Sequence, residues 1–225
     1  CPIPAPIPNP IPTPTPTPIP TPTPTPTPDP VPATPDVVVD GVKVVTETST
    51  AADGSQVEAI TIPTVVSTRT NTDGAVTVAD IPLVTSNGAK VLEAAVPVGM
   101  GLQVSGIAAA KDAASSLANL IAAINDRTTT GSDEQSTLVD GGSSFLNSLD
   151  PSTAMYVRTI VATTAGTASP GNSALLISGT AHTEGAPQTA LVIDTRAMAS
   201  DISIELQNVD FAALIGSATV RGGAG

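Results

Sequence analysis

Residues 37–50 read VVVDGVKVVTETST, and this stretch decides the fold class of the chain. Valines and threonines flank the pair Asp40-Gly41, and β-branched residues of this kind favour extended backbone. Both central residues of a type I′ turn need a positive φ, which Asp and Gly tolerate. The stretch therefore predicts a β-hairpin, with strands at residues 37–39 and 42–48.

The same turn signal recurs at Asp53-Gly54, Asp73-Gly74 and Asn87-Gly88. The segments between these turns, and one that follows them, are predicted to be strands: residues 56–66, 75–84, 89–98 and 102–107. The first three contain one proline each (Pro63, Pro82 and Pro97). Because proline cannot donate to a ladder, we expect these strands to be edges, bulged or interrupted. The pattern is typical of an antiparallel meander.

One amphipathic helix is predicted over residues 113–126. Leu117, Leu120, Ile121 and Ile124 recur at helical spacing, and Asp112 is suited to cap the first turn. We interpret the apolar stripe as core that covers one face of a sheet. A shorter helical stretch is expected at residues 133–139 or 143–149, because Asp140-Gly141-Gly142 should break a longer helix.

The β pattern returns after Pro151, with turn signals at Pro170-Gly171-Asn172 and near Pro187. The predicted strands are residues 154–163, 174–180, 189–195, 202–206 and 218–221. The sequence therefore predicts a mostly β fold, an antiparallel sandwich-like body with one packed amphipathic helix, over residues 36–225.

Residues 1–35 form a separate proline-rich arm. Every even position from Pro2 to Pro32 is proline, which favours a polyproline II rod about 100 Å long. The arm carries no charge before Asp29, and its isoleucines are candidate assembly contacts: Ile3, Ile7, Ile11 and Ile19. Two roles stay open, a stiff spacer and an element that docks on a neighbouring subunit.

The composition restricts the classes of partner. The chain has 20 acidic and 8 basic residues, so its net charge of −12 disfavours binding to nucleic acid or to anionic lipid. The sequence contains no apolar run long enough to span a membrane. Cys1 is the single cysteine, which excludes an intramolecular disulfide. It is a candidate for lipid attachment or an intermolecular crosslink, or it marks where a longer polypeptide was cut.

No pattern in the sequence predicts catalysis. The single histidine, His182, lies in a predicted loop, and no nucleophile has a base beside it in the sequence. Acidic residues such as Asp194, Asp201 and Glu205 could form a carboxylate pair only if the fold brought them together. We expect no catalytic, cofactor-binding or metal-binding residue, although calcium stays open at the acidic stretch Ser132-Asp133-Glu134 with Asp140.

Several segments resemble known secreted proteins: ADIPLVT at residues 79–85, ALVIDTR at 190–196, IELQNVDFAALIG at 204–216 and GGAG at 222–225. Together with the threonine-proline tract, they are similar to the region upstream of the calcium-binding nonapeptide repeats in large bacterial repeats-in-toxin (RTX) surface proteins. The resemblance implies export, surface display and a calcium-binding β-roll beyond the end of this chain. The nonapeptide itself is missing, so it assigns no calcium ligand here.

These observations favour a non-enzymatic protein outside the bacterial cell or on its surface. Our first hypothesis is a structural subunit of a fibre, sheath or surface layer, in which the arm contacts another copy of the chain. The alternative is the stalk-and-head binding module of a secreted adhesin or calcium-dependent RTX-type surface protein.

Overall fold

The computed structural model describes residues 37–70, 76–165, 174–181, 183 and 185–222. The chain divides into two units, residues 1–32 and 33–225, and every described residue belongs to the second. The predictions for the arm, including Cys1 and the four isoleucines, lie outside the described residues. So do the predicted turns at Asp73-Gly74 and Pro170-Gly171-Asn172, and His182.

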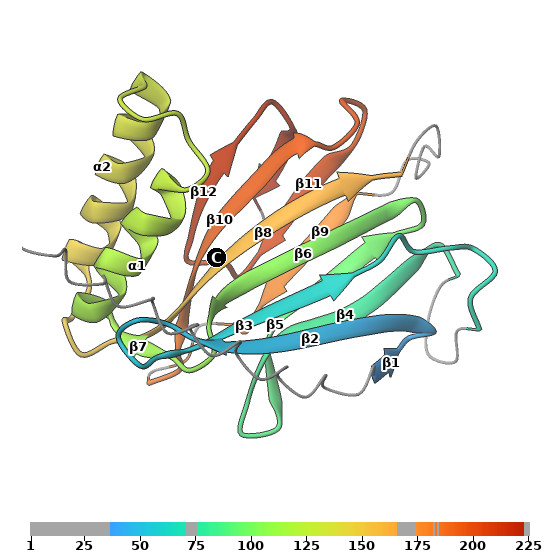
Figure 1. Ribbon diagram of the computed structural model, residues 1–225, viewed down its shortest axis with the longest axis horizontal. Coiled ribbons are helices and arrows are strands. Elements are labelled where there is room, and N and C mark those ends of the chain that lie inside the picture. Colours follow the sequence, from blue (N-terminus) through green and yellow to red (C-terminus); the bar gives the residue numbers. More distant parts are fainter. Residues whose placement is uncertain (1–36, 71–75, 166–173, 182, 184, 223–225) are drawn as a thin grey trace, which may run out of the picture. The chain divides into compact units, whose positions relative to one another are not determined.

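The described strands form two sheets that face each other (Figure 1). The first sheet has the order β1 (Val37–Val39), β2 (Val42–Thr50), β3 (Gln56–Ile62), β6 (Met100–Ile107), β8 (Ala154–Thr164), β10 (Gln188–Ala197) and β12 (Phe211–Ile215), with β7 (Lys111–Asp112) paired to β8. The second has the order β13 (Thr219–Gly222), β11 (Ser203–Gln207), β9 (Leu175–Gly179), β5 (Ala89–Pro97) and β4 (Val78–Ser86). The predicted mostly β, sandwich-like class is confirmed.

The first half of the chain forms the predicted antiparallel hairpins β1–β2, β2–β3 and β4–β5. The prediction of one continuous meander was wrong, because β3 pairs with β6 while β4 and β5 lie in the second sheet. Asp40 and Gly41 have φ values of 46° and 71°, and Asn87 and Gly88 have values of 51° and 79°, as type I′ turns require. Glycine is needed at position 41 for space as well, because a Cβ there would lie 2.3 Å from the carbonyl oxygen of Thr70.

The three prolines also lie where the ladder tolerates them. Pro82 is in β4, the last strand of its sheet, and the β4–β5 register shifts directly after it. Pro97 is the last residue of β5, and Pro63 follows the end of β3. The expectation is therefore confirmed for the edge strand with Pro82 and for the strand that ends before Pro63, whereas β5 is an inner strand that extends to Pro97.

The second half of the chain is a two-sheet coil. From β8 to β13 the strands alternate between the sheets, so that β8, β10 and β12 pair in parallel in one sheet and β9, β11 and β13 in the other. Val157 pairs with Ala190 and Ala190 with Phe211, steps of 33 and 21 residues. The predicted strand positions agree with the structure, but the pairing of these strands is parallel. Alternation within a strand shows which side chains are buried and carries no information about the direction of the neighbour.

Helices α1 (Ala113–Asn125) and α2 (Asp133–Ser148) cover the outer face of the first sheet over β8, β10 and β12 (Figure 1). Asp112 caps α1 as predicted, since its Oδ1 accepts from the Ser115 N–H at 2.8 Å. Leu120 and Ile124 are fully buried, whereas Leu117 and Ile121 are half-buried. Neither of the two helices in the described ranges is long and apolar enough to cross a membrane.

Helix α2 corrects one expectation, because it continues through Asp140-Gly141-Gly142 without a break. Gly142 is buried against α1, and a Cβ there would lie 3.0 Å from the Cδ2 atom of Leu120. Close packing of the two helices therefore offsets the low helix propensity of the glycines.

Strand β10 separates two apolar cores, which explains why its central run TALVIDT is buried on both faces. Leu191 and Ile193 face the second sheet, while Ala190 and Val192 face the helices. The core under the helices also contains Phe145 and Phe211, whose stacked ring centroids are 5.1 Å apart.

The two glycines of α2 offer a test of this packing. We expect Gly141→Ala to stabilise the fold by about 0.5–1 kcal/mol, because the exposed site gains helix propensity and a Cβ there meets no atom within 4 Å. Gly142→Ala should be at least about 1 kcal/mol less stable than Gly141→Ala, because Leu120 must move. Urea denaturation of both variants measures the difference; equal stabilities would contradict the packing explanation.

Candidate functional site

The two ends of the sandwich differ in how their edge strands are covered. At one end the sheets finish with β1 and β4, and at the other with β12 and β13. An edge strand exposes unpaired N–H and C=O groups that can pair with another chain, so natural proteins usually protect it. The edges are therefore the first candidate for a functional surface.

The β4 edge is protected by side chains of other segments. The Asp80 N–H donates to the Asp40 carboxylate at 3.0 Å. Arg69 donates to the carbonyl oxygens of Val76 at 2.8 Å, Val78, and Asp40 at 3.0 Å. Arg69 and Asp40 also form a buried ion pair at 3.6 Å. These contacts and Pro82 occupy or remove outward main-chain groups at Val78, Asp80 and Pro82, the register shifts follow directly, and β1 is only three residues long.

The edge formed by β12 and β13 has no such protection among the described residues. No described strand pairs with the outer side of either strand, and neither contains a proline or a register shift. Strand β12 carries no charge, and β13 carries only that of Arg221. Within the part of the chain that the structure describes, this end of both sheets is therefore uncovered.

One hydrogen bond shows which main-chain groups of β12 face outward. The Thr195 hydroxyl donates to the Ile215 carbonyl oxygen at 2.9 Å, so the main-chain groups of Ile215 face β10. Consecutive residues of a strand direct these groups to opposite sides. The N–H and C=O groups of Ala212 and Leu214 therefore face the open edge.

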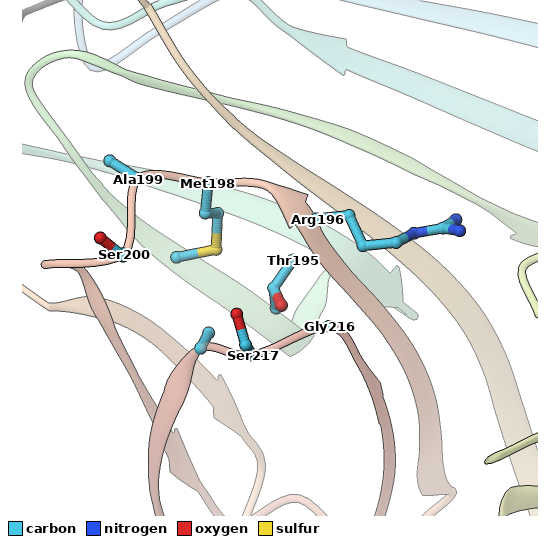
Figure 2. A pocket seen from close by; sticks show the side chains of 8 residues that line it. Thr195, Arg196, Met198, Ala199, Ser200, Gly216 and Ser217 are labelled. Atoms are coloured by element: carbon cyan, nitrogen blue, oxygen red, sulfur yellow. The ribbon is translucent and has the colours of Figure 1, made fainter.

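The turns that connect the sheets near this edge line a shallow pocket of about 190 Å³ (Figure 2). Its walls include Met198, Ser200 and Ser217, and the Arg196 side chain extends away from them. Gly216 has a φ of 108°, and a Cβ there would lie 2.5 Å from the Thr195 hydroxyl oxygen. The lining contains hydroxyls and a thioether but no carboxylate, so we interpret the pocket as the contact between two successive turns of the coil.

Asp194 is the central residue of a charged cluster at the end of β10. Its carboxylate accepts from Arg196 Nε at 2.9 Å and Nη2 at 2.6 Å, and it lies 3.9 Å from Arg127, which follows α1. Hydrogen bonds from Arg196 lower the pKa of Asp194, against the effect of burial. Glu205, which was considered from the sequence as a carboxylate partner of Asp194, lies in β11 of the other sheet. The cluster joins the helical layer to the sheet.

A second charged group lies between the sheets. Arg158 is 1% exposed, and it donates to the Ile107 carbonyl oxygen and, at 3.2 Å, to the half-buried Glu58. Burial lowers the pKa of Arg158, partly offset by Glu58. The pair borders a polar cavity of about 220 Å³ that also includes Thr46 and Thr85. Because the guanidinium is paired inside the protein, we interpret it as structural.

A more apolar groove of about 380 Å³ lies between α1 and the uncovered part of the first sheet. Ala122 and Ala123 of α1 form one side, and Val57, Ile107 and Val157 of the sheet form the other. This groove is the described feature best suited to a small apolar ligand.

The structure does not bring the calcium candidates together. Asp133 and Glu134 lie in the first turn of α2, where carboxylates favour the helix dipole, and Asp140 lies further along the same helix. The Ser132 hydroxyl instead caps α2, accepting from the Gln135 N–H at 3.1 Å. Among the described residues, no three Asp, Glu, His or Cys side chains form a group that could hold a metal ion.

Comparison of the chain with family models, with curated proteins and with solved structures finds no match. The resemblance to RTX surface proteins therefore stays a prediction. The open edge was not predicted from the sequence. Residues 211–215, which form β12, were not among the predicted strands, and strand residues do not reveal which strand ends a sheet.

The role of Asp194 can be tested through the pH dependence of stability. Its pKa is lower in the folded protein than the usual 3.8, so its contribution is complete above pH 3.8 and is lost as the pH falls through the folded pKa. We expect Asp194→Asn to cost about 1.5–3 kcal/mol at pH 7 and to reduce the loss of stability below pH 3.8. Urea denaturation from pH 7 to pH 2 measures both.

The exposed Asp140 provides the control. Asp140→Asn should change stability by less than about 0.5 kcal/mol at pH 7. If Asp194→Asn had an equally small effect and kept the wild-type acid profile, the ion pair would not hold the helical layer as described.

Proposed function

We propose that the chain is a non-enzymatic structural subunit of an extracellular bacterial assembly such as a fibre, sheath or surface layer, whose proline-rich arm contacts a neighbouring subunit. The observation that carries the proposal is the open edge of β12 and β13 at one end of the sandwich. Uncovered edges of this kind favour pairing with a further strand. In a subunit of an assembly, that strand comes from the next copy.

The asymmetry of the two ends supports a head-to-tail assembly. The arm precedes β1, and β1 lies at the edge of the first sheet opposite to β12. A contact between two different surfaces of identical subunits is heterologous, and it builds an open filament when the rotation does not close a ring. Addition of one subunit then leaves the same open edge on the next.

The charged side chains in the interior support a structural role. Asp194, Arg158 and Arg69 each have a partner of opposite charge in the described residues. These pairs tie strands, turns and the helical layer together, so they are explained without a substrate. A location outside the cell or on its surface belongs to the same proposal, and it is supported by the resemblance to secreted surface proteins.

Removal of residues 1–35 tests the proposal. We expect the intact chain to form filaments or sheets and the shortened chain to stay monomeric, because the shortened chain keeps the open edge but lacks the contacting segment. Sedimentation velocity and negative-stain electron microscopy distinguish the two states. A chain whose arm is replaced by Gly-Ser residues of equal length is the control, because it keeps the length of the segment but not its sequence, and it should also stay monomeric. Normal filaments from the shortened chain would rule out the role of the arm.

The groove beside α1 favours a second candidate, the binding module of an adhesin. That function requires a monomeric body that binds a ligand. Isothermal calorimetry with calcium, with glycans and, for the groove itself, with a small apolar probe tests it: heat of binding from a monomeric chain would favour the module, and filaments without any heat would favour the subunit.

A further inference from the structure

We infer that the arm of one subunit pairs with the outer edge of β12 of the next subunit as a one-sided β-strand, with its prolines facing away from the sheet. This inference rests on the proposed function and specifies the surface that receives the arm. It assigns the period-two pattern of the arm a role in hydrogen bonding, beyond that of a stiff spacer.

The first argument is the spacing of the prolines. They occupy every even position from Pro2 to Pro32, so every main-chain donor in this stretch belongs to an odd position. In an extended strand, residues two apart direct their N–H groups to the same side. All donors of the arm would then face one neighbour, and all proline rings the opposite edge, which is the arrangement that a sheet tolerates for proline.

A rod alone does not require this regularity. Polyproline II has three residues per turn and makes no internal hydrogen bonds, so strict alternation places its prolines all around the axis. Only a structure with a repeat of two keeps them on one side. The regular spacing therefore fits a strand better than a rod that packs through its rings.

The second argument is the form of the receiving edge. On β12 the N–H and C=O groups of Ala212 and Leu214 face outward, as the bond from Thr195 to Ile215 shows. On β4, by contrast, the outward groups of Val78 and Asp80 already bond to Arg69 and Asp40. Of these two edges, β12 is the one with groups available to a partner.

Charge and side-chain pattern agree with this placement. Strand β12 is uncharged, and the arm is uncharged before Asp29. The side chains of odd positions share one face of an extended strand, and Ile3 and Ile7 are close enough in sequence for both to lie beside the five residues of β12 and extend one apolar core. The side chains on β12 already alternate between the two cores of the body, which offers such a surface on either face.

The arrangement also limits growth. Once the arm is paired, its outer side presents proline carbonyls but no N–H donors, which disfavours the addition of a further strand there. Each subunit would thus accept one arm, and assembly would continue only through the next body. A chain with an open β edge would in this way form a filament with one arm between successive bodies, rather than an aggregate that adds strands at its edges without limit.

Prolines placed at odd positions of the arm distinguish a strand from a rod. Proline at every odd position from 3 to 27 removes all donors of that stretch, whatever its register on β12, while it keeps the polyproline II preference. We expect it to raise the subunit concentration needed for assembly about tenfold for each hydrogen bond lost at the β12 edge. The matched control, threonine at every one of these positions, keeps the donors and should assemble like the original chain. Unchanged assembly of the proline variant would overturn the inference.

The receiving edge is tested by Ala212→Pro against Ala212→Ser in the full chain. The proline removes an outward donor without touching the groups that pair with β10, so it should weaken assembly about tenfold, whereas the serine should not. Because Ala212→Pro could disturb the body, hydrogen–deuterium exchange of the original chain provides a second measurement. We expect the segment Phe211–Ile215 to exchange at least tenfold more slowly in the assembled state.

The outcomes separate the two proposals. Filaments whose Phe211–Ile215 segment exchanges as fast as in diluted monomer would overturn the pairing on β12 but leave the structural function intact. A full chain that stays monomeric at all concentrations would overturn both. Slow exchange confined to assembled chains, lost with the odd-position prolines, would support both.

Discussion

The main-chain N–H and C=O groups at the rim of each sheet are the constraint on which the arrangement of this protein depends. Inside the sandwich the ladders satisfy them, and apolar residues fill both cores. At the β4 rim, Asp40 and Arg69 take the place of a strand. At the β12 rim no described group does so, which makes the two ends of one molecule chemically different.

Much of the fold could be predicted from local sequence, because the deciding interactions are local. Asp40-Gly41 and Asn87-Gly88 specify type I′ turns through the φ values that these residues tolerate. The spacing of Leu120 and Ile124 specifies the buried face of α1. Pro82 marks an edge strand because it lacks a donor, whatever its neighbours are.

The remaining features depend on residues that are far apart in the chain. Arg158 pairs with Glu58 across 100 positions, and Arg69 reaches the carbonyl of Asp40 across 29. Helix α2 continues through Gly142 because α1 packs there, a contact that helix propensity alone does not reveal. The parallel pairing of β10 was missed for the same reason. The candidate surface is a consequence of that topology, so no single motif could have identified it.

The direction of strand pairing explains why the open end lies in the second half of the chain. An antiparallel strand can be joined by a two-residue turn, so the first half covers β2 with β1 at little cost in length. A parallel strand needs a crossover, and here each crossover passes through the other sheet. Every added turn of the coil therefore covers one pair of edges and creates another. Such a coil does not close on itself, so its last two described strands, β12 and β13, lie at the edges of the two sheets.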